Sequence, residues 1–103
     1  MNRIKRIEQM EHFLDVSRKT LDDLEHAFAA YESAQAEYKE LCDYYESSAW
    51  LEDYEADEAG ELPPELKRGV LSEDAVYDLI TDNHELILRM LKVITRSLEN
   101  KTI

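Results

Sequence analysis

The chain has 103 residues, a formal net charge of −12 and 44% hydrophobic residues. This length suits one small domain, and the apolar content is too high for a disordered chain, although 35% of the residues are charged. The strong acidity argues against direct binding to nucleic acid or to an anionic membrane surface. A single cysteine excludes an internal disulfide and a cysteine-based zinc site.

Two further features point to a soluble, cytoplasmic, all-α protein. No apolar run approaches the ~20 residues of a membrane span, and charges occupy the N-terminal positions where a signal peptide needs an apolar stretch. Both glycines and both prolines lie between Gly60 and Gly69, which argues against turn-rich β folds.

Residues 3–47 are predicted to form one long amphipathic helix. There is no glycine or proline in this range, and apolar residues recur at spacings of three and four. These positions form a heptad seam whose only polar interruptions are Ser17 and Gln35. The apolar members of the heptad seam are Ile7, Met10, Leu14, Leu21, Leu24, Phe28, Tyr31, Tyr38, Cys42 and Tyr45.

The apolar pattern stops after Tyr45, so a kink is predicted at Ser47-Ser48. A short acidic helix over residues 49–59 should follow and end at Gly60.

A connector is predicted over residues 60–71. It holds Leu62-Pro63-Pro64, where extended backbone is expected because each residue before a proline is pushed away from the helical region. One helical turn is expected over residues 65–68, closed by Gly69.

The last helix is predicted over residues 72–99. Ser72 is a suitable N-cap, and Leu71 can pack on Val76 across the first turn. The apolar residues that follow recur with helical spacing to the end of the chain.

The two long helices are predicted to form an antiparallel hairpin. The first would be roughly 65–70 Å long and the last only about 40 Å, so part of the heptad seam would stay uncovered. A second copy of the chain could cover it, which predicts a homodimeric helical bundle. The alternative is a break in the first helix, with Thr20 as an N-cap.

The acidity belongs to the middle of the chain. Residues 1–20 carry a net charge of +2, residues 21–66 a net charge of −14, and residues 67–103 balance. The densest stretch runs from Glu52 to Glu61, and a charge run of this kind is most often a solvated face.

The sequence contains no catalytic motif and no complete metal-binding motif, so neither an enzyme nor a cofactor is expected. The three histidines do not converge in the predicted hairpin, and Cys42 lies on the seam beside acidic residues that would not activate a thiol. Asp53, Glu55 and Asp57 resemble the first ligands of a calcium loop, but Glu58 and Pro64 replace the glycine and glutamate that such a loop needs. These three carboxylates remain weak candidates for loose binding of a divalent cation.

The unusual residues of the chain concentrate between the two long helices. Aromatic side chains mixed with charges on a connector have the composition of a recognition surface. The alternative is structural, with Trp50 and Tyr54 closing the end of the hairpin while Lys67 and Arg68 neutralise nearby acids. The predicted partner-binding residues are Tyr44, Tyr45, Trp50, Asp53, Tyr54, Glu55, Lys67 and Arg68.

The same segment carries a resemblance to a known family. The residues concerned are Tyr44-Tyr45, Ser48, Trp50, Asp53, Glu55, Leu62-Pro63 and the stretch from Leu66 to Asp74, which reads LKRGVLSED. They resemble the signature of a family of small acidic bacterial proteins described only as a domain of unknown function. The resemblance implies a bacterial or phage-related origin over nearly the full chain, and it implies no activity, substrate or ligand.

Three functional hypotheses follow. The first is a non-enzymatic protein–protein interaction module that binds an unidentified protein through the connector. The second is electrostatic mimicry, in which the acidic face of residues 21–66 occupies the basic groove of a nucleic-acid-binding protein. The third is weak binding of a divalent metal at the three carboxylates named above.

Overall fold

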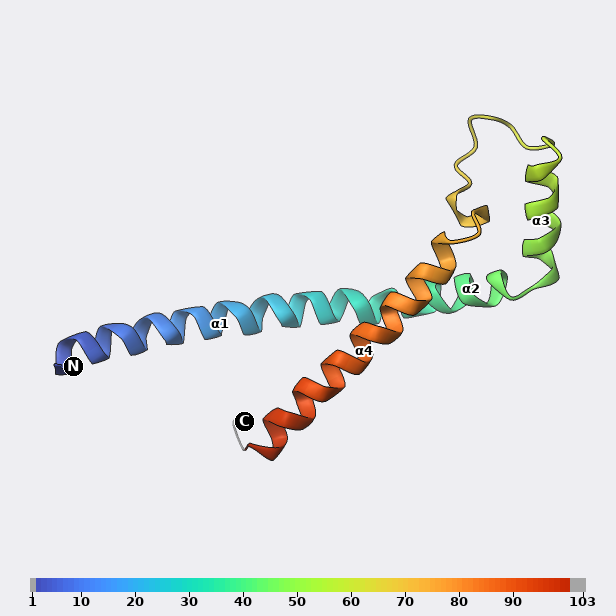
Figure 1. Cartoon of the computed structure of the whole chain (residues 1–103). Coiled ribbons are helices and arrows are strands. Elements are labelled where there is room, and N and C mark those ends of the chain that lie inside the picture. The colour runs from blue at the N-terminus through green and yellow to red at the C-terminus, as the bar shows by residue number, and fades with distance from the viewer. Residues whose placement is uncertain (1, 101–103) are drawn as a thin grey trace. The chain divides into compact units, whose positions relative to one another are not determined.

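A computed structural model describes residues 2–100, and in that range the chain folds into helices joined by turns, with no strand. The predicted all-α class is confirmed. The elements are α1 (Arg3–Ser33), α2 (Gln35–Tyr45), α3 (Ser48–Glu58), the 3₁₀ helix η1 (Gly69–Leu71) and α4 (Ala75–Glu99), shown in Figure 1. The chain divides into two compact units, Met1–Tyr38 and Lys39–Ile103, and each is described by itself. The antiparallel hairpin concerns both units and remains a prediction.

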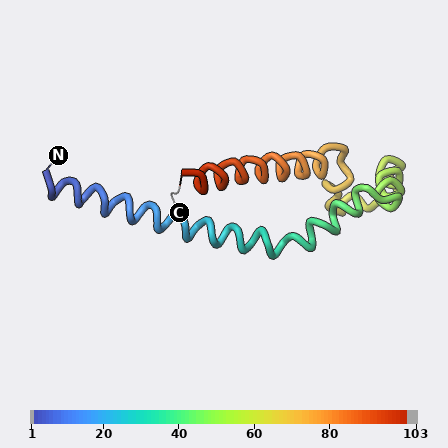
Figure 2. The backbone as a smooth tube through the Cα atoms, turned by 90° about the horizontal axis from the view of Figure 1, so that it is seen from below, coloured from blue at the N-terminus to red at the C-terminus, as the bar shows by residue number. Residues whose placement is uncertain are grey.

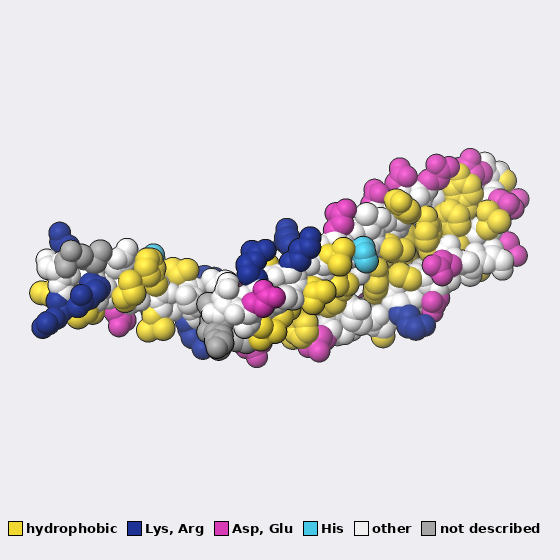
Figure 3. Space-filling view, turned by 60° about the horizontal axis from the view of Figure 1, so that its bottom comes forward, with side chains coloured by type: hydrophobic (Ala, Val, Ile, Leu, Met, Phe, Trp, Pro, Cys, Tyr) yellow, Lys and Arg dark blue, Asp and Glu magenta, His cyan; other side chains and the backbone are white. Residues whose placement is uncertain are grey.

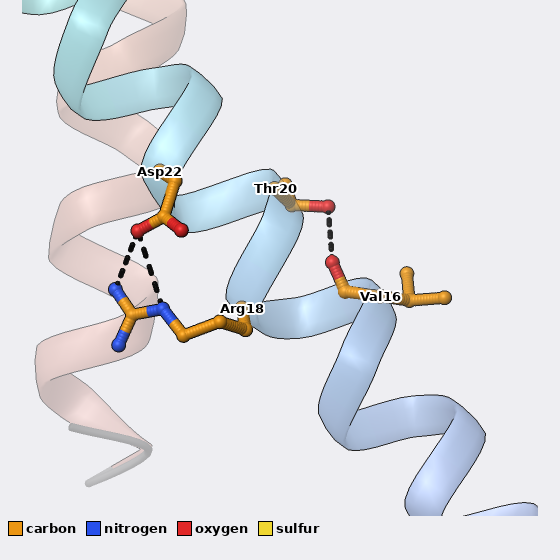
Figure 4. A network of polar contacts seen from close by, with 4 residues as sticks. All are labelled: Val16, Arg18, Thr20 and Asp22. Carbon is orange, nitrogen blue, oxygen red and sulfur yellow. Dashed lines mark hydrogen bonds and ion pairs between the residues drawn. The ribbon is translucent and has the colours of Figure 1, made fainter.

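The first unit consists of α1 and the beginning of α2. Asn2 caps α1, since its backbone is extended and its side-chain oxygen accepts a hydrogen bond from the Lys5 N–H at 2.8 Å. The helix runs without a break through Thr20, whose hydroxyl donates to the Val16 carbonyl at 2.8 Å (Figure 4). The alternative of a helix break with Thr20 as an N-cap is therefore wrong.

The junction between α1 and α2 is a single residue, Ala34. Its N–H donates to the Ala30 carbonyl at 3.1 Å, and its own carbonyl accepts from the Tyr38 N–H at 3.0 Å. Both bonds have the i to i−4 spacing of an α-helix, so the helical hydrogen-bond ladder continues across Ala34. The structure thus has helix on both sides of one irregular residue where one helix over residues 3–47 was predicted.

Side-chain pairs along α1 add little to its stability. Arg18 donates to Asp22 at 2.8 Å (Figure 4) and Lys19 to Asp23 at 2.7 Å. These i, i+4 pairs are exposed and have the basic residue first, the weaker orientation, so each contributes a few tenths of a kcal/mol at most. Most apolar residues of α1 are exposed as well, while Tyr31 is half-buried. In general, most of the stability of a helix in a protein comes from packing of its apolar face against another element.

The second unit begins with the end of α2 and turns into α3. Ser47 caps α3 with extended backbone, at the position where a kink and restart were predicted. At the other end of α3, Gly60 has a φ of +72°, which suits glycine. The Gly60 N–H bonds to the Asp57 carbonyl and the Glu61 N–H to the Ala56 carbonyl, each at 3.0 Å. These two bonds form a Schellman motif, which ends the helix at the predicted glycine.

The connector differs from the prediction in one detail. No helical turn forms over residues 65–68; instead the Leu66 N–H bonds to the Pro63 carbonyl at 3.1 Å, closing a β-turn with Pro64 in the second position, which proline favours. The helical turn lies further along, in η1, so Gly69 opens that turn and does not close one. Figures 1 and 2 show the connector returning from the end of α3 to η1, which lies beside α3.

The core of the second unit is small. Leu71 and Val76 are 6% and 3% exposed and are the buried residues of the described range 2–100. The Ser72 hydroxyl accepts the N–H of Ala75, the first residue of α4, at 3.2 Å. The helix begins at Ala75 and not at the predicted residue 72, and its N-cap position is occupied by Asp74 without a side-chain hydrogen bond, so Ser72 is not the N-cap that was predicted. Both members of the predicted apolar pair, Leu71 and Val76, are buried.

None of the helices formed by residues 2–100 has the length and apolarity that crossing a membrane requires.

Candidate functional site: an aromatic clasp

Three aromatic rings stack at the bend between α2 and α3. The Trp50 ring meets Tyr45 edge-on, with centroids 5.2 Å apart and planes at 74°. On its other side Trp50 stacks on Tyr54, with centroids 5.2 Å apart and planes at 18°. Trp50 and Tyr54 are four residues apart in α3 and therefore share one face of the helix. Both arrangements are among the favourable geometries of aromatic pairs, so the three rings fix the angle at which α3 leaves α2.

The indole of Trp50 also ties α3 to the connector. Its ring N–H donates to the Val70 carbonyl at 2.9 Å, across 20 residues of sequence. The indole is half-buried, and Val70 lies in η1, directly before the buried Leu71. A partly buried hydrogen bond of this kind contributes about 1 kcal/mol and orients the ring.

Two tyrosine hydroxyls make further links. Tyr44 donates to Asp53 at 2.5 Å, joining α2 to α3. Tyr54 donates to Glu73 at 3.0 Å, joining α3 to the residues that precede α4. The hydrogen bond to Asp53 raises the pKa of Tyr44 to about 12, with burial and the negative charge adding to the effect. The bond to Glu73 raises the pKa of Tyr54 in the same way, together with the nearby Glu58 charge.

Ser47 stabilises the bend itself. Its hydroxyl donates to the Tyr44 carbonyl at 2.6 Å and accepts the Trp50 N–H at 3.4 Å. One hydroxyl therefore provides a hydrogen-bond partner for a backbone carbonyl at the end of α2 and for a backbone N–H at the start of α3.

An ion pair completes these contacts. Arg68 lies 2.9 Å from Asp57, with side chains that are 34% and 24% exposed. This pair fastens the connector to the last turn of α3. Because both side chains are more sheltered than those of the other ion pairs described in residues 2–100, it should be the most favourable of them.

These residues together form one element, which we call the clasp. Its members are Tyr44, Tyr45, Ser47, Trp50, Asp53, Tyr54, Asp57, Arg68, Val70 and Glu73. The structure brings together six of the eight residues predicted for the partner-binding surface, and it leaves the other two, Glu55 and Lys67, exposed.

The clasp contains four residues that the sequence did not place in the binding surface. Ser47 could have been found from its N-cap position, and Asp57 from its carboxylate near an isolated basic pair. Glu73 was included in the stretch LKRGVLSED that carries the family resemblance. The part played by Val70 could not be found from its side chain, because its backbone carbonyl makes the contact.

The three carboxylates considered for a metal do not form a common site. Asp53 accepts from Tyr44 and Asp57 pairs with Arg68, while Glu55 is exposed. Within residues 2–100, no three His, Cys, Asp or Glu side chains are placed so that they could hold a metal ion. The geometry gives the metal hypothesis no support.

The outer surface of α3 is strongly acidic. Glu52, Asp53, Glu55 and Glu58 are all exposed on this 11-residue helix. Figure 3 shows acidic side chains gathered along the end of the second unit, bordering apolar atoms. Leu51 is 51% exposed among these acids, and Leu66 in the connector is 49% exposed.

The tyrosine contacts predict a measurable titration. Tyr44 should ionise near pH 12, and Asp53→Asn should return its pKa toward the usual value of 10, because the charged acceptor is gone. The folded-state pKa lies above the unfolded one, so the stabilisation is present below about pH 10 and is lost as pH rises through about 12. Phenolate absorbance of the wild type minus that of Tyr44→Phe isolates this group. A difference curve with a midpoint at the ordinary tyrosine value would contradict the contact.

One family model matches residues 7–93 of the chain, and its description is Domain of unknown function (DUF4298). The predicted resemblance to a family of unknown function is confirmed by this match. No curated protein and no solved structure matches the chain.

Proposed function

Because the chain belongs to the family described as Domain of unknown function (DUF4298), we propose its function from the clasp: a non-enzymatic, cytoplasmic protein–protein interaction module. The partner would bind the rim of the clasp, which we define as the exposed residues Leu51, Glu55, Leu66 and Lys67.

One observation carries this proposal. The connector is joined to α3 by the hydrogen bond from Trp50 to Val70 and by the ion pair of Arg68 with Asp57, and yet Leu51 in α3 and Leu66 in the connector are about half exposed. A surface that is ordered before binding loses less conformational entropy when a partner arrives. Apolar side chains surrounded by charges supply contact area together with discrimination between partners.

In this proposal the aromatic residues of the clasp support the rim and do not contact the partner themselves. The Trp50 ring contacts Tyr45 and Tyr54 and its N–H donates to Val70, and the hydroxyls of Tyr44 and Tyr54 also donate to groups within the chain. These three side chains position the rim, and the rim makes the contact. The structural and the recognition hypotheses for the connector are thus compatible.

The test uses charge reversal on the rim, where folding should be unaffected. Tagged wild-type protein, Glu55→Lys and Lys67→Glu would be used to capture partners from nuclease-treated bacterial lysate. Glu99→Lys and Lys92→Glu on α4 are the matched controls. We expect recovery of a specific partner to fall about tenfold for each rim variant, which corresponds to about 1.4 kcal/mol of binding free energy, and to be unchanged for the controls.

Two outcomes would go against the rim. A partner recovered equally by all variants would place its binding site elsewhere, and the absence of any specific partner would leave the clasp with a structural part only. Trp50→Ala is unsuitable for this test because it would disturb the clasp as well as any bound surface.

Electrostatic mimicry is the second candidate, favoured by the four exposed carboxylates of α3. It predicts that a basic, nucleic-acid-binding partner is released steeply as salt is raised, since the attraction between exposed charges is screened. Retention of the partner at high salt would favour the rim.

A further inference from the structure

Large apolar residues of the heptad seam are exposed along α1. The first unit is made of α1 and the beginning of α2, and seam residues Leu14, Leu21, Leu24 and Phe28 are 52–61% exposed. In proteins most of the stability of a helix comes from packing of its apolar face, so an exposed apolar stripe of this kind favours association. We propose that a second copy of this chain covers the seam in an antiparallel arrangement centred near His26. This interface is separate from the rim and goes beyond the proposed function.

The polar interruptions of the seam fix the register. When the two helices run antiparallel about His26, Ser17 of one copy faces Gln35 of the other. Every remaining layer from residue 14 to residue 38 is then apolar against apolar, pairing Leu14 with Tyr38, Leu21 with Tyr31, and Leu24 with Phe28. A polar pair inside an apolar seam discriminates against other registers, because a shift would bury each polar group against a hydrophobic side chain.

The positions beside the seam agree with this register. Arg18 and Glu32 both directly follow seam residues, and the antiparallel arrangement brings them to the same edge of the interface. The register therefore matches opposite charges on this edge of the interface.

The distribution of charge favours antiparallel over parallel packing. Residues 14–20 carry a net charge of +1 and the residues that would face them, 32–38, a net charge of −2. A parallel pair would set each of these segments against itself, and the acidic ends would repel.

Cross-linking of single-cysteine variants tests whether a second copy of the chain covers the seam and whether the two helices run antiparallel. Cys42→Ser provides a cysteine-free full-length background, into which Ser17→Cys or Gln35→Cys is introduced. One of the two proteins carries a larger tag, so that mixed and self-linked products separate by size. A short bifunctional maleimide is added to each protein alone and to an equal mixture, and sedimentation equilibrium gives the oligomeric state. Ser33→Cys, on the outer face of the same helix, is the matched control.

We expect a dimer in which the mixture of Ser17→Cys and Gln35→Cys cross-links and neither protein alone does so. In the proposed register the two Ser17 positions lie about 27 Å apart along the helix axis, beyond the reach of the reagent. Self-linking of each single variant would show a parallel pair and overturn the proposal. A monomer without cross-links would also overturn it and would mean that another segment of the chain or a different protein covers the seam.

Discussion

Replacing Trp50 with alanine is expected to lower the free energy of unfolding by about 3 kcal/mol. The change removes two ring contacts, on Tyr45 and on Tyr54, and it leaves the Val70 carbonyl without its donor. The value lies at the low end for a tryptophan because the side chain is only half-buried. Chemical denaturation followed by far-ultraviolet circular dichroism measures it, since Trp50 is the sole tryptophan and the variant has no indole fluorescence.

Two comparisons make this result specific. Trp50→Phe keeps an aromatic ring in the stack but loses the N–H, so it should cost about 1 kcal/mol. Tyr77→Ala removes an aromatic residue that is 61% exposed and should change stability by less than about 0.5 kcal/mol. Equal stability of Trp50→Ala and the wild type would show that the clasp does not hold the second unit together.

Replacing Leu71 with alanine is the second large effect, with an expected loss of about 2–3 kcal/mol. Leu71 is 6% exposed and with Val76 makes up the buried part of the described chain, so no neighbouring core can compensate for the cavity. The measurement is the denaturant midpoint, repeated at two protein concentrations so that any contribution from self-association is separated.

Leu51→Ala serves as the control for Leu71. It deletes the same side chain at a position that is 51% exposed, so the expected change in unfolding free energy is within about 0.5 kcal/mol. If Leu51→Ala destabilised the protein as much as Leu71→Ala, burial in the structure would not explain the stability of the connector.

The local signals for helices and their ends could be predicted well from the sequence. Asn2, Ser47 and Ser72 accept backbone N–H groups at helix starts, and Gly60 takes a positive φ at a helix end. These features depend on interactions within a few residues, and the chemistry of the side chain is enough to find them. The restart at Ser47 and the helix end at Gly60 were predicted, whereas the cap at Asn2 was not, and α4 begins three residues after the predicted start at Ser72.

The connector was predicted less accurately. The helical turn expected over residues 65–68 forms as η1 instead, because the Pro63 carbonyl bonds to the Leu66 N–H and Arg68 reaches Asp57. The two prolines favour extended backbone followed by a β-turn. The position of the next turn depends on the ion pair between Arg68 and Asp57, which lies about ten residues earlier in the sequence.

The residues of the clasp could be selected from the sequence, but their contacts could not. The sequence singled out Trp50, Tyr54 and Arg68 as unusual and left open whether they bind a partner or close the fold. The structure turns all three toward contacts within the chain and leaves Glu55 and Lys67 on the surface.

By itself, then, the sequence determined the all-α class, the kink before α3, the acidic character of the middle segment and the membership in a family of unknown function. These properties follow from composition, from periodicity and from interactions between residues near in sequence. Only the tertiary structure decided that the Trp50 indole donates to Val70 and that Tyr54 reaches Glu73. Those contacts join residues about 20 positions apart, and their geometry is set by how α3 and the connector pack, which no local pattern encodes.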